Sequence, residues 1–378
     1  MKQIAIKLTF LASLAFVLIA CDNTMGDTDS RLSDVKSLIE PLNNKAIELD
    51  PSPSASVYFE WDYARVEDAG TAVYQIAFDV PGGDFSNPVY MMNSGNNGLN
   101  NNVTITHKQM NKIAKMIGIL TSETGSFKWT IFSTKGTKTV KSGQENTITI
   151  TRLAGLEPPI DVYLTGEGSE GGTDASKAHK MKAVSNGLFE VYTKLTAGKP
   201  FYFTEDLSGS LREFYTSDGL IKENGTTTVA TEGVYRITLD FETGACTYSL
   251  VTRIGFYFSP EGKILFDLPY VGYGVFQTKA TVTFKQEGWG RDERYKFRMF
   301  IKENAGAGAE KELEWSTLNG TDSRPLASSP ESYYYMLLTE NVTQWDNKWK
   351  LMGDFDDVEA VYTIYLTADQ DYTHTITK

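Results

Sequence analysis

Short runs in which apolar and polar residues alternate recur along most of the chain. Residues 57–61, 127–132 and 233–241 each place an apolar side chain at nearly every second position. Because successive side chains of a β-strand point to opposite faces, this period of two is typical of strands with one buried face. Trp61 and Trp129 lie within such runs, so we expect them in the core. The sequence therefore predicts an all-β fold, and its 12% content of aromatic residues agrees with that fold class.

One segment departs from this pattern and predicts a short helix between residues 106 and 118. Thr106 and Gln109 form a capping-box pattern, and Gly118 can end the helix. We expect the apolar stripe of this helix to cover an open end of a sandwich. The stripe consists of Met110, Ile113, Met116 and Ile117.

The first residues have the features of a secretion signal. Lys2 and Lys7 precede an apolar run over residues 8–20 that is too short to span a bilayer. The run ends in small residues before Cys21, a pattern at which bacterial lipoproteins are cleaved and lipidated; an ordinary cleavage site with an incidental cysteine is the alternative. We expect residues 1–20 to be removed, Cys21 to carry the lipid, and this anchor to be the chain's only contact with the membrane.

Changes in composition divide the rest of the chain. Residues 21–37 are polar and rich in Asp without an apolar period, which predicts a flexible tether. Pro158 and Pro159, at the end of residues 156–159, interrupt strand pairing, because proline has no backbone N–H to donate to a neighbouring strand. A chain of 378 residues is also longer than one core usually organises. We predict three domains after the tether, over residues 38–153, 157–251 and 252–378.

Charge and the scarcity of cysteine and histidine argue against several kinds of site. The net charge of −12 disfavours nucleic acid and anionic lipid as partners. Once Cys21 is lipidated, Cys246 has no partner for a disulfide within the chain, and its alternating surroundings predict a small buried side chain. His107, His179 and His374 lie far apart in the sequence, without cysteines or carboxylates at ligand spacing. We expect no metal and no cofactor.

Three glycines match a nucleotide-binding motif in spacing alone. Gly166, Gly168 and Gly171 follow a predicted strand with the spacing of the dinucleotide fingerprint. The residues that follow are polar and lack the helical apolar spacing of a parallel β-α unit. The sequence predicts a flexible loop here.

Several segments together resemble the SusE/SusF family of surface lipoproteins from Bacteroidetes glycan-uptake systems, and the likeness covers nearly the whole chain. Residues 39–44, 57–61 and 127–129 are similar to the immunoglobulin-like first domain of the family. Residues 189–203 and 233–250 resemble its first carbohydrate-binding sandwich. The segments similar to its last sandwich are Trp289, residues 295–299, residues 345–350 and residues 372–376.

The resemblance implies a fold and a function. The fold is a tandem of β-sandwiches, immunoglobulin-like first and then two carbohydrate-binding-like units. The function is that of a lipoprotein on the exterior of the outer membrane that binds starch-like or other polysaccharide or oligosaccharide beside a Sus-type transporter and its partner lipoprotein. The middle unit departs from the family pattern. Residues 166–172 lack the Trp that members carry there, and Tyr202 stands where members carry Lys. The main site is therefore expected in the last domain.

A glycan site needs a flat aromatic face on which sugar C–H groups stack, with a few polar groups for the hydroxyls. Trp289, Trp315, Trp345 and Trp349 lie in polar segments of the last domain, and we expect at least one of them to be exposed. For Trp349, packing beneath the last sandwich is the alternative. The side chains expected to supply hydrogen bonds are Arg291, Arg298, Asn319, Asn347 and Lys350.

The leading hypothesis is a non-catalytic surface protein that captures polysaccharide or oligosaccharide for uptake. A structural or adhesive envelope lipoprotein that binds protein partners is the alternative from another class. A hydrolase is the third possibility, because acidic pairs can meet in space without a sequence motif. The tryptophans of the last domain favour the first hypothesis over the second.

Overall fold

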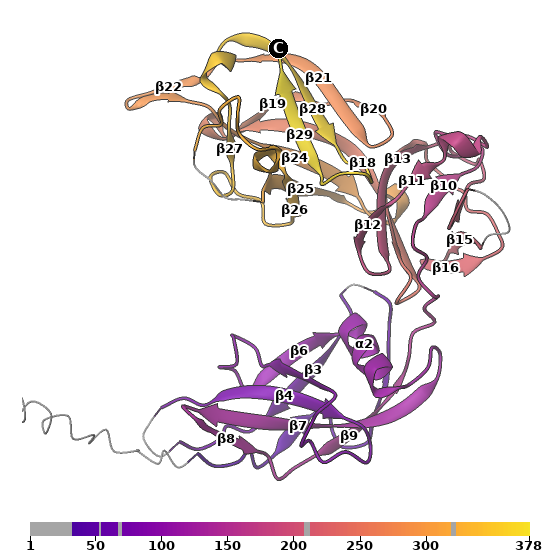
Figure 1. Ribbon diagram of the computed structural model, residues 1–378, viewed down its shortest axis with the longest axis vertical. Helices are drawn as coiled ribbons and strands as arrows, with labels where there is room; N and C mark the ends of the chain where they lie inside the picture. The colour runs from indigo at the N-terminus through magenta and orange to yellow at the C-terminus, as the bar shows by residue number, and fades with distance from the viewer. Residues whose placement is uncertain (1–31, 53, 67–69, 208–211, 319–322) are drawn as a thin grey trace, which may run out of the picture. The chain divides into compact units, whose positions relative to one another are not determined.

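Both compact units of the chain consist of β-sheets, with one α-helix among the described residues (Figure 1), which confirms the predicted all-β fold. The units meet in the sequence between Arg152 and Leu153. Cys21 and the expected signal lie outside the described residues. The computed structural model describes residues 32–52, 54–66, 70–207, 212–318 and 323–378.

The first unit is a sandwich of two sheets. Phe59 of one sheet meets Phe78 and Trp129 of the other edge to face, with ring centroids 5.6 and 5.1 Å apart. Trp61 and Trp129 are fully buried, as their alternating runs predict. The smaller sheet has the order β1 (Leu38–Glu40), β3 (Ser56–Trp61), β6 (Asn102–Thr106). The larger has the order β2 (Lys45–Glu48), β9 (Asn146–Thr151), β7 (Thr124–Lys135), β4 (Val73–Asp79), β5 (Tyr90–Asn93), with β8 (Lys138–Lys141) paired to β7.

The predicted helix is α2 (His107–Ile117), and both predicted caps are present. The Thr106 side chain accepts a hydrogen bond from the Gln109 amide, and Gly118 ends the helix in the left-handed conformation that glycine tolerates best. Met110 and Ile113 are fully buried, whereas Met116 is 47% exposed. The expected apolar stripe is therefore correct for its first part and wrong for Met116.

Packing of the first unit begins earlier than Leu38. Leu32 and Val35 are buried, and the Ser142 hydroxyl donates to the Val35 carbonyl at 2.7 Å. The expected tether over residues 21–37 is therefore too long, because its last part belongs to the sandwich. Two isolated apolar residues in a polar segment have no period by which the sequence could reveal them.

One long strand links the two halves of the second unit. β18 (Ala245–Phe258) pairs through its first half with β17 (Gly233–Asp240) and through its second half with β24 (Arg294–Lys302). A single sheet therefore runs through residues 163–350. Its other strands in the middle of the chain are β10 (Tyr163–Thr165), β11 (His179–Lys180), β12 (Lys182–Ser185), β13 (Leu188–Leu195), β14 (Tyr202–Thr204), β15 (Glu213–Ser217) and β16 (Leu220–Glu223).

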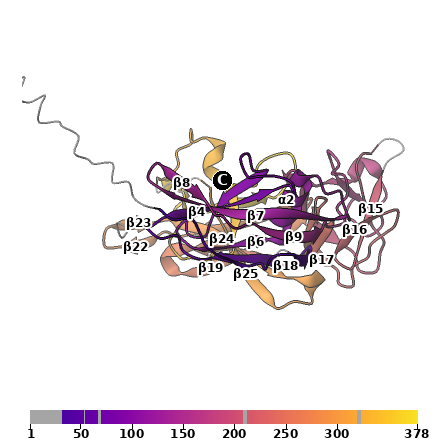
Figure 2. The ribbon, with the colours of Figure 1, turned by 90° about the horizontal axis from the view of Figure 1, so that it is seen from below.

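A second sheet faces the last part of this sheet and closes a sandwich. The first sheet continues here with β19 (Lys263–Asp267), β25 (Glu310–Thr317), β26 (Met336–Thr339) and β27 (Trp349–Lys350). The facing sheet has the order β20 (Tyr270–Gly272), β21 (Val275–Val282), β28 (Val358–Tyr365), β29 (Thr373–Thr377). The hairpin of β22 (Lys285–Glu287) and β23 (Gly290–Asp292) projects from this sandwich (Figures 1 and 2). Short 3-10 helices are η1 (Ala175–Lys177), η2 (Ser259–Glu261), η3 (Asn304–Gly306), η4 (Glu331–Tyr334) and η5 (Gly353–Phe355).

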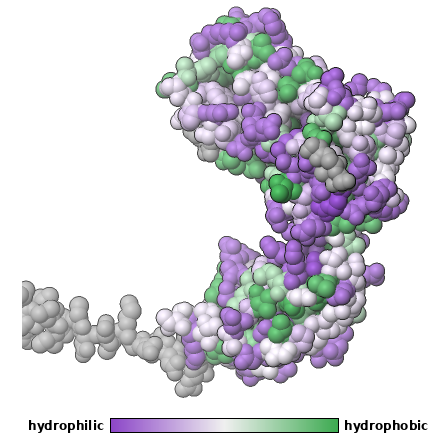
Figure 3. All heavy atoms as spheres, turned by 45° about the vertical axis from the view of Figure 1, so that its right-hand side comes forward, coloured by the Kyte–Doolittle hydropathy of each residue, from purple (hydrophilic) through white to green (hydrophobic). Residues whose placement is uncertain are grey.

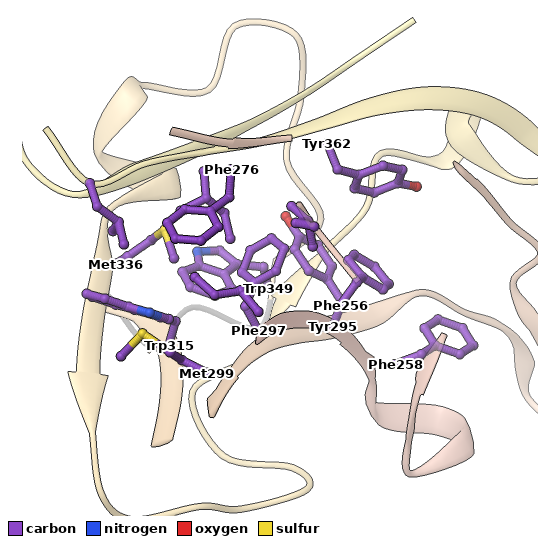
Figure 4. Packing of buried hydrophobic residues seen from close by; sticks show 14 of the residues in the cluster. Phe256, Phe258, Phe276, Tyr295, Phe297, Met299, Trp315, Met336, Trp349 and Tyr362 are labelled. Carbon is purple, nitrogen blue, oxygen red and sulfur yellow. The ribbon is translucent and has the colours of Figure 1, made fainter. Parts of the chain in front are cut away.

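The second unit contains two hydrophobic cores. One gathers side chains from Val162 to Cys246, and the other gathers side chains from Val251 to Leu366 together with Tyr192 of β13 (Figure 4). We propose from these two cores that residues 157–251 and 252–378 are two sandwiches, although the boundary between them falls inside β18. Burial raises the pKa of the Cys246 thiol to about 11, which agrees with a packed side chain rather than a reactive one.

A half-buried carboxylate joins the two sandwiches. Glu170 accepts hydrogen bonds from the Thr193 hydroxyl of the first sandwich at 2.8 Å, and from the Tyr270 hydroxyl and the Tyr273 amide of the second at 2.5 and 2.9 Å. Burial opposes ionisation of Glu170, but contacts with His179, Tyr270, Tyr273 and Thr193 outweigh it and lower its pKa to about 2.

The glycine-rich segment brings Glu170 to this position. A side chain at Gly168 would place its Cβ 2.4 Å from the Lys199 carbonyl oxygen, and one at Gly171 would place it 2.1 Å from the Lys177 carbonyl oxygen. The glycines therefore allow close backbone packing and not nucleotide binding. The predicted loop is present as a run of turns, and groups that are distant in the sequence hold the Glu170 carboxylate between its glycines.

A second carboxylate crosses the same junction. Glu190 of β13 pairs with Arg236 of β17 at 2.6 Å and accepts a hydrogen bond from the Tyr372 hydroxyl at 2.9 Å. Tyr192, on the same strand, packs edge to face with Tyr372 at 5.9 Å between ring centroids. The two sandwiches are thus held together by hydrogen bonds to charged groups as well as by their shared strand.

The Glu170 contacts predict a pH-dependent stability. Because the pKa of Glu170 is lower in the folded state than its ordinary value of 4.5, its stabilising contribution is complete above that value and is lost as the pH falls towards 2. We expect the wild type to exceed Glu170→Gln in free energy of unfolding, and this difference to shrink by about 3 kcal/mol between pH 6 and pH 2. Urea unfolding at a series of pH values measures it.

Glu167→Gln is the matched control for this experiment. Its side chain is 58% exposed and lies 3.4 Å from the Lys199 ammonium group, so its pairing should contribute little. We expect this variant to follow the wild type across the pH range. Equal pH dependence of the two variants would contradict the role assigned to Glu170.

Candidate functional site

The tryptophans of the last sandwich separate into two buried and two exposed side chains. Trp315 is 1% exposed and Trp349 is fully buried, whereas Trp289 is 69% exposed and Trp345 is 41% exposed. At least one exposed indole was expected from the sequence, and the structure has two. A flat apolar ring open to water is the feature that a sugar-stacking site requires.

Trp315 and Trp349 are core residues, so the expectation that they face a ligand was wrong. Trp315 packs edge to face with Tyr372 at 5.6 Å between ring centroids. Trp349 stacks on Tyr295 at 5.9 Å, and its indole N–H donates to the Tyr333 carbonyl at 2.9 Å (Figure 4). The alternative that Trp349 packs beneath the last sandwich agrees with the structure. Both residues lie on strands, β25 and β27, whose inward positions belong to the core.

Trp289 and Trp345 come from different segments and meet across one arginine. Trp289 lies in the turn between β22 and β23, and Trp345 lies in the connection from β26 to β27. The guanidinium carbon of Arg294 is 4.5 Å from the ring centroid of Trp345 and 5.8 Å from that of Trp289. These are cation–π distances, so Arg294 links the two indoles. We call Trp289, Arg294 and Trp345 the aromatic platform.

Asp292 fixes the guanidinium of Arg294. The carboxylate is 2% exposed and accepts two hydrogen bonds from Arg294, one of them from Nε at 2.8 Å. A bidentate pair of this kind holds a planar guanidinium in one orientation. Arg294 was not predicted as a site residue from the sequence. The pattern that could have indicated it is the alternation of Arg294, Lys296 and Arg298 with apolar residues along a single strand.

Three of the remaining expected polar groups lie on β23, on β27 and in the connection before β27. Arg291 is exposed on β23 and pairs with Asp356 at 2.5 Å. Asn347 is exposed, and its carbonyl accepts a hydrogen bond from the Thr317 amide at 3.0 Å. Lys350 is half-buried on β27, where its register partner is Arg294. Asn319 lies outside the described residues.

Arg298 is buried, so the expectation that it faces a ligand in this structure was wrong. It is 2% exposed and belongs to a cluster with Lys296 and Glu314, whose side chains are equally covered. Each cation lies within 2.8 Å of the Glu314 carboxylate, and the guanidinium carbon of Arg298 lies 4.1 Å from the ring centroid of Tyr257. Burial lowers the pKa of Lys296, and the contact with Glu314 opposes this shift. We call Lys296, Arg298 and Glu314 the charge cluster.

The histidine and the aspartates of the last sandwich are engaged within the protein. Burial lowers the pKa of His374 to about 3, so its imidazole is neutral, and its Nε2 lies 2.7 Å from the Tyr295 hydroxyl. Asp354 pairs with Lys378 at 2.7 Å, and Asp357 accepts a hydrogen bond from the Thr283 hydroxyl. Among the described residues, no group of three or more His, Cys, Asp or Glu side chains is placed to hold a metal ion.

A hollow of about 310 Å³ lies in the first unit, and none of the four tryptophans of the last sandwich lines it. Its lining includes Pro41, Ile47, Val57, Tyr58 and His107. Tyr58 supplies one aromatic ring there, whereas the platform combines two indoles with a fixed cation. The platform is therefore the better candidate for stacking.

The surface and the helices add two further observations. On the face shown in Figure 3, hydrophilic residues cover much of the second unit, in keeping with the acidic composition.

No helix within the described part of the chain has the length and apolar character needed to cross a membrane.

A family model described as SusE outer membrane protein matches residues 23–131. Among solved structures, SusF from Bacteroides thetaiotaomicron aligns with 12% sequence identity and a TM-score of 0.26, over 92% of this chain and 75% of that chain. No curated protein sequence matches the chain. The match over residues 23–131 confirms that the chain resembles the SusE family of outer membrane proteins, as the sequence predicts.

Proposed function

We propose that the chain is a non-catalytic glycan-binding lipoprotein that captures polysaccharide or oligosaccharide for a Sus-type uptake system. The observation that carries the proposal is the aromatic platform, in which Trp289 and Trp345 are exposed on either side of Arg294. An indole that is open to water offers a flat apolar face on which a ligand can stack. The family match adds that proteins resembling the first unit belong to the outer membrane.

The chemistry of the platform suits a sugar ring. One face of a pyranose ring carries C–H groups that stack on an indole, and its hydroxyl groups need donors and acceptors close by. Arg291, Asn347 and Lys350 are the polar side chains we assign to this role. We assign the same role to Asn319. Because Arg291 and Arg294 are each paired with an aspartate, the platform offers directional donors rather than a large excess of positive charge.

We further propose that the mature chain is anchored through Cys21 to the outer membrane and faces the exterior. Two or three acyl chains, at about 0.8 kcal/mol per buried methylene group, suffice to hold a folded protein on a membrane. The proposed partners are the glycan, a Sus-type transporter and its partner lipoprotein, and we propose no nucleic acid partner.

Affinity electrophoresis in gels that contain a polysaccharide tests glycan binding. We expect wild-type protein to be retarded by at least one neutral or acidic polysaccharide, and Trp289→Ala and Trp345→Ala each to weaken that retardation. The loss of one stacking ring should cost about 1–2 kcal/mol, which corresponds to a roughly five- to thirty-fold loss of affinity.

Tyr63→Ala is the matched control, because Tyr63 is a 65% exposed aromatic residue of the first unit. It should leave the retardation unchanged. If neither tryptophan variant alters the retardation of a polysaccharide that binds wild type, the platform is not the site. If no polysaccharide in a broad set binds while envelope proteins co-purify with the chain, the adhesive alternative is correct. Release of reducing sugar from a bound polymer would show a hydrolase.

Cell fractionation tests the anchor. We expect Cys21→Ser, secreted behind a signal that is cleaved without a cysteine, to move the protein from the membrane fraction to the soluble fraction, because the thiol is the proposed lipid attachment point. Cys246→Ala is the control, since Cys246 is a buried side chain of the second unit. It should leave the protein in the membrane fraction. Membrane retention of a processed Cys21→Ser variant would contradict the proposed anchor.

A further inference from the structure

Before Trp345, the connection that carries it is bonded to the sheet at Thr343. The Lys296 ammonium group donates to both the carbonyl and the hydroxyl of Thr343, each at 2.8 Å. Arg298 donates to the same carbonyl at 2.6 Å. In return, the Thr343 amide donates to the Glu314 carboxylate at 2.9 Å. All three members of the charge cluster therefore converge on a single residue of a surface segment.

The neighbouring residue adds a second tie. The Gln344 side-chain amide donates to the Ser259 carbonyl at 2.9 Å, which joins the same segment to η2. Trp345 follows directly, and its ring lies over Arg294. The backbone before Trp345 and the face of its ring are thus held by separate contacts. An exposed indole on a connection between strands would otherwise be free to adopt several rotamers.

Burying the charge cluster costs hydration free energy, so its presence in the interior points to a role beyond packing. Each buried ion loses its hydration, and a buried ion pair is often no more stable than well-packed apolar residues of the same size. Lys296, Arg298 and Glu314 are all 2% exposed or less. Apolar side chains at these positions could cover the sheet, but they could not bond the backbone of the connection. The bonds to Thr343 are what the charges provide beyond burial.

We propose that Thr343, held by the charge cluster, is a positioning residue that fixes Trp345 in the orientation required for stacking. The proposal rests on the function proposed above, because it assigns Trp345 to the glycan platform. A ring that is ordered before the ligand arrives loses less conformational entropy on binding, so the affinity is higher. The charge cluster then acts on the ligand through the loop and not by direct contact.

Fluorine NMR of protein labelled with 5-fluorotryptophan tests the proposal without any ligand. The chain has six tryptophans, and Trp345→Phe identifies the Trp345 signal by its disappearance. Lys296→Met removes both bonds from Lys296 to Thr343 and leaves Arg298 paired with Glu314. We expect the Trp345 signal to shift or broaden in this variant, while the signals of Trp315 and Trp349 stay in place.

Two variants of Thr343 support the test, and Lys279→Met is its control. If Lys296→Met does not fold, Thr343→Val replaces it in the test. This variant removes only the hydroxyl acceptor and should also perturb the Trp345 signal. Thr343→Ser keeps the hydroxyl and should give the wild-type spectrum. Lys279→Met is the matched control, because the Lys279 side chain is 68% exposed on β21. It should leave every signal unchanged.

The outcomes separate this proposal from the proposed function. An unchanged Trp345 signal in the folded variants overturns the proposal, and so does an equal change at Trp315 and Trp349, which would indicate general loosening of the sandwich. With a polysaccharide that retards wild type, we expect Lys296→Met to bind roughly three- to ten-fold more weakly. If wild type binds no polysaccharide, the proposed function fails, but the ligand-free spectra still decide whether Thr343 positions Trp345.

Discussion

The alternation of side chains along β24 is the constraint on which the last sandwich depends. Tyr295, Phe297 and Met299 point inward and form the centre of its core. The positions between them carry cations, and these build the outer face of the same sheet. One strand thus determines both the packing that keeps the sandwich folded and the groups that support the candidate site. A shift of the β24 register by one residue would exchange the two sets of side chains.

The outer face of this strand separates into two parts with different exposure. Arg294, at the start of β24, lies between two exposed indoles and is held by Asp292. Lys296 and Arg298, further along, are covered by the connection to which they donate hydrogen bonds. The platform is therefore built on a rigid sheet with its supporting groups in place, which is the arrangement that favours precise binding.

Charged hydrogen bonds add to apolar packing at the junction of the two sandwiches in the second unit. Glu170 and Glu190 each accept bonds from both sandwiches, and β18 passes through both. Removing one partner of such a carboxylate leaves a poorly solvated charge and lowers the free energy of unfolding. These junctions therefore favour one arrangement of the two sandwiches over others. This makes the second unit a single scaffold for the platform.

Local patterns in the sequence predicted the all-β fold, the caps of α2 and the core positions of Trp61 and Trp129, because these depend on neighbours in the chain. The burial of Trp315 could not be predicted in this way. Its neighbours Glu314 and Ser316 make the segment look like a polar loop, yet both are buried, and Glu314 accepts a hydrogen bond from the Thr343 amide.

The role of Arg294 and the junction at Glu170 were missed for the same reason. Both depend on partners that the fold brings together from distant parts of the chain. Trp289 and Trp345 lie in connections rather than in strands, so polar surroundings were a valid sign of exposure for them.

The most direct measurement is a titration of protein labelled with ¹⁵N-tryptophan, followed through its indole N–H signals, with an oligosaccharide from a polysaccharide that retards wild type. We expect the signals of Trp289 and Trp345 to move with the added sugar, while those of the buried Trp315 and Trp349 stay nearly fixed. Saturable changes confined to any other tryptophan, with Trp289 and Trp345 unmoved, would contradict the claim that these two indoles form the glycan-binding surface.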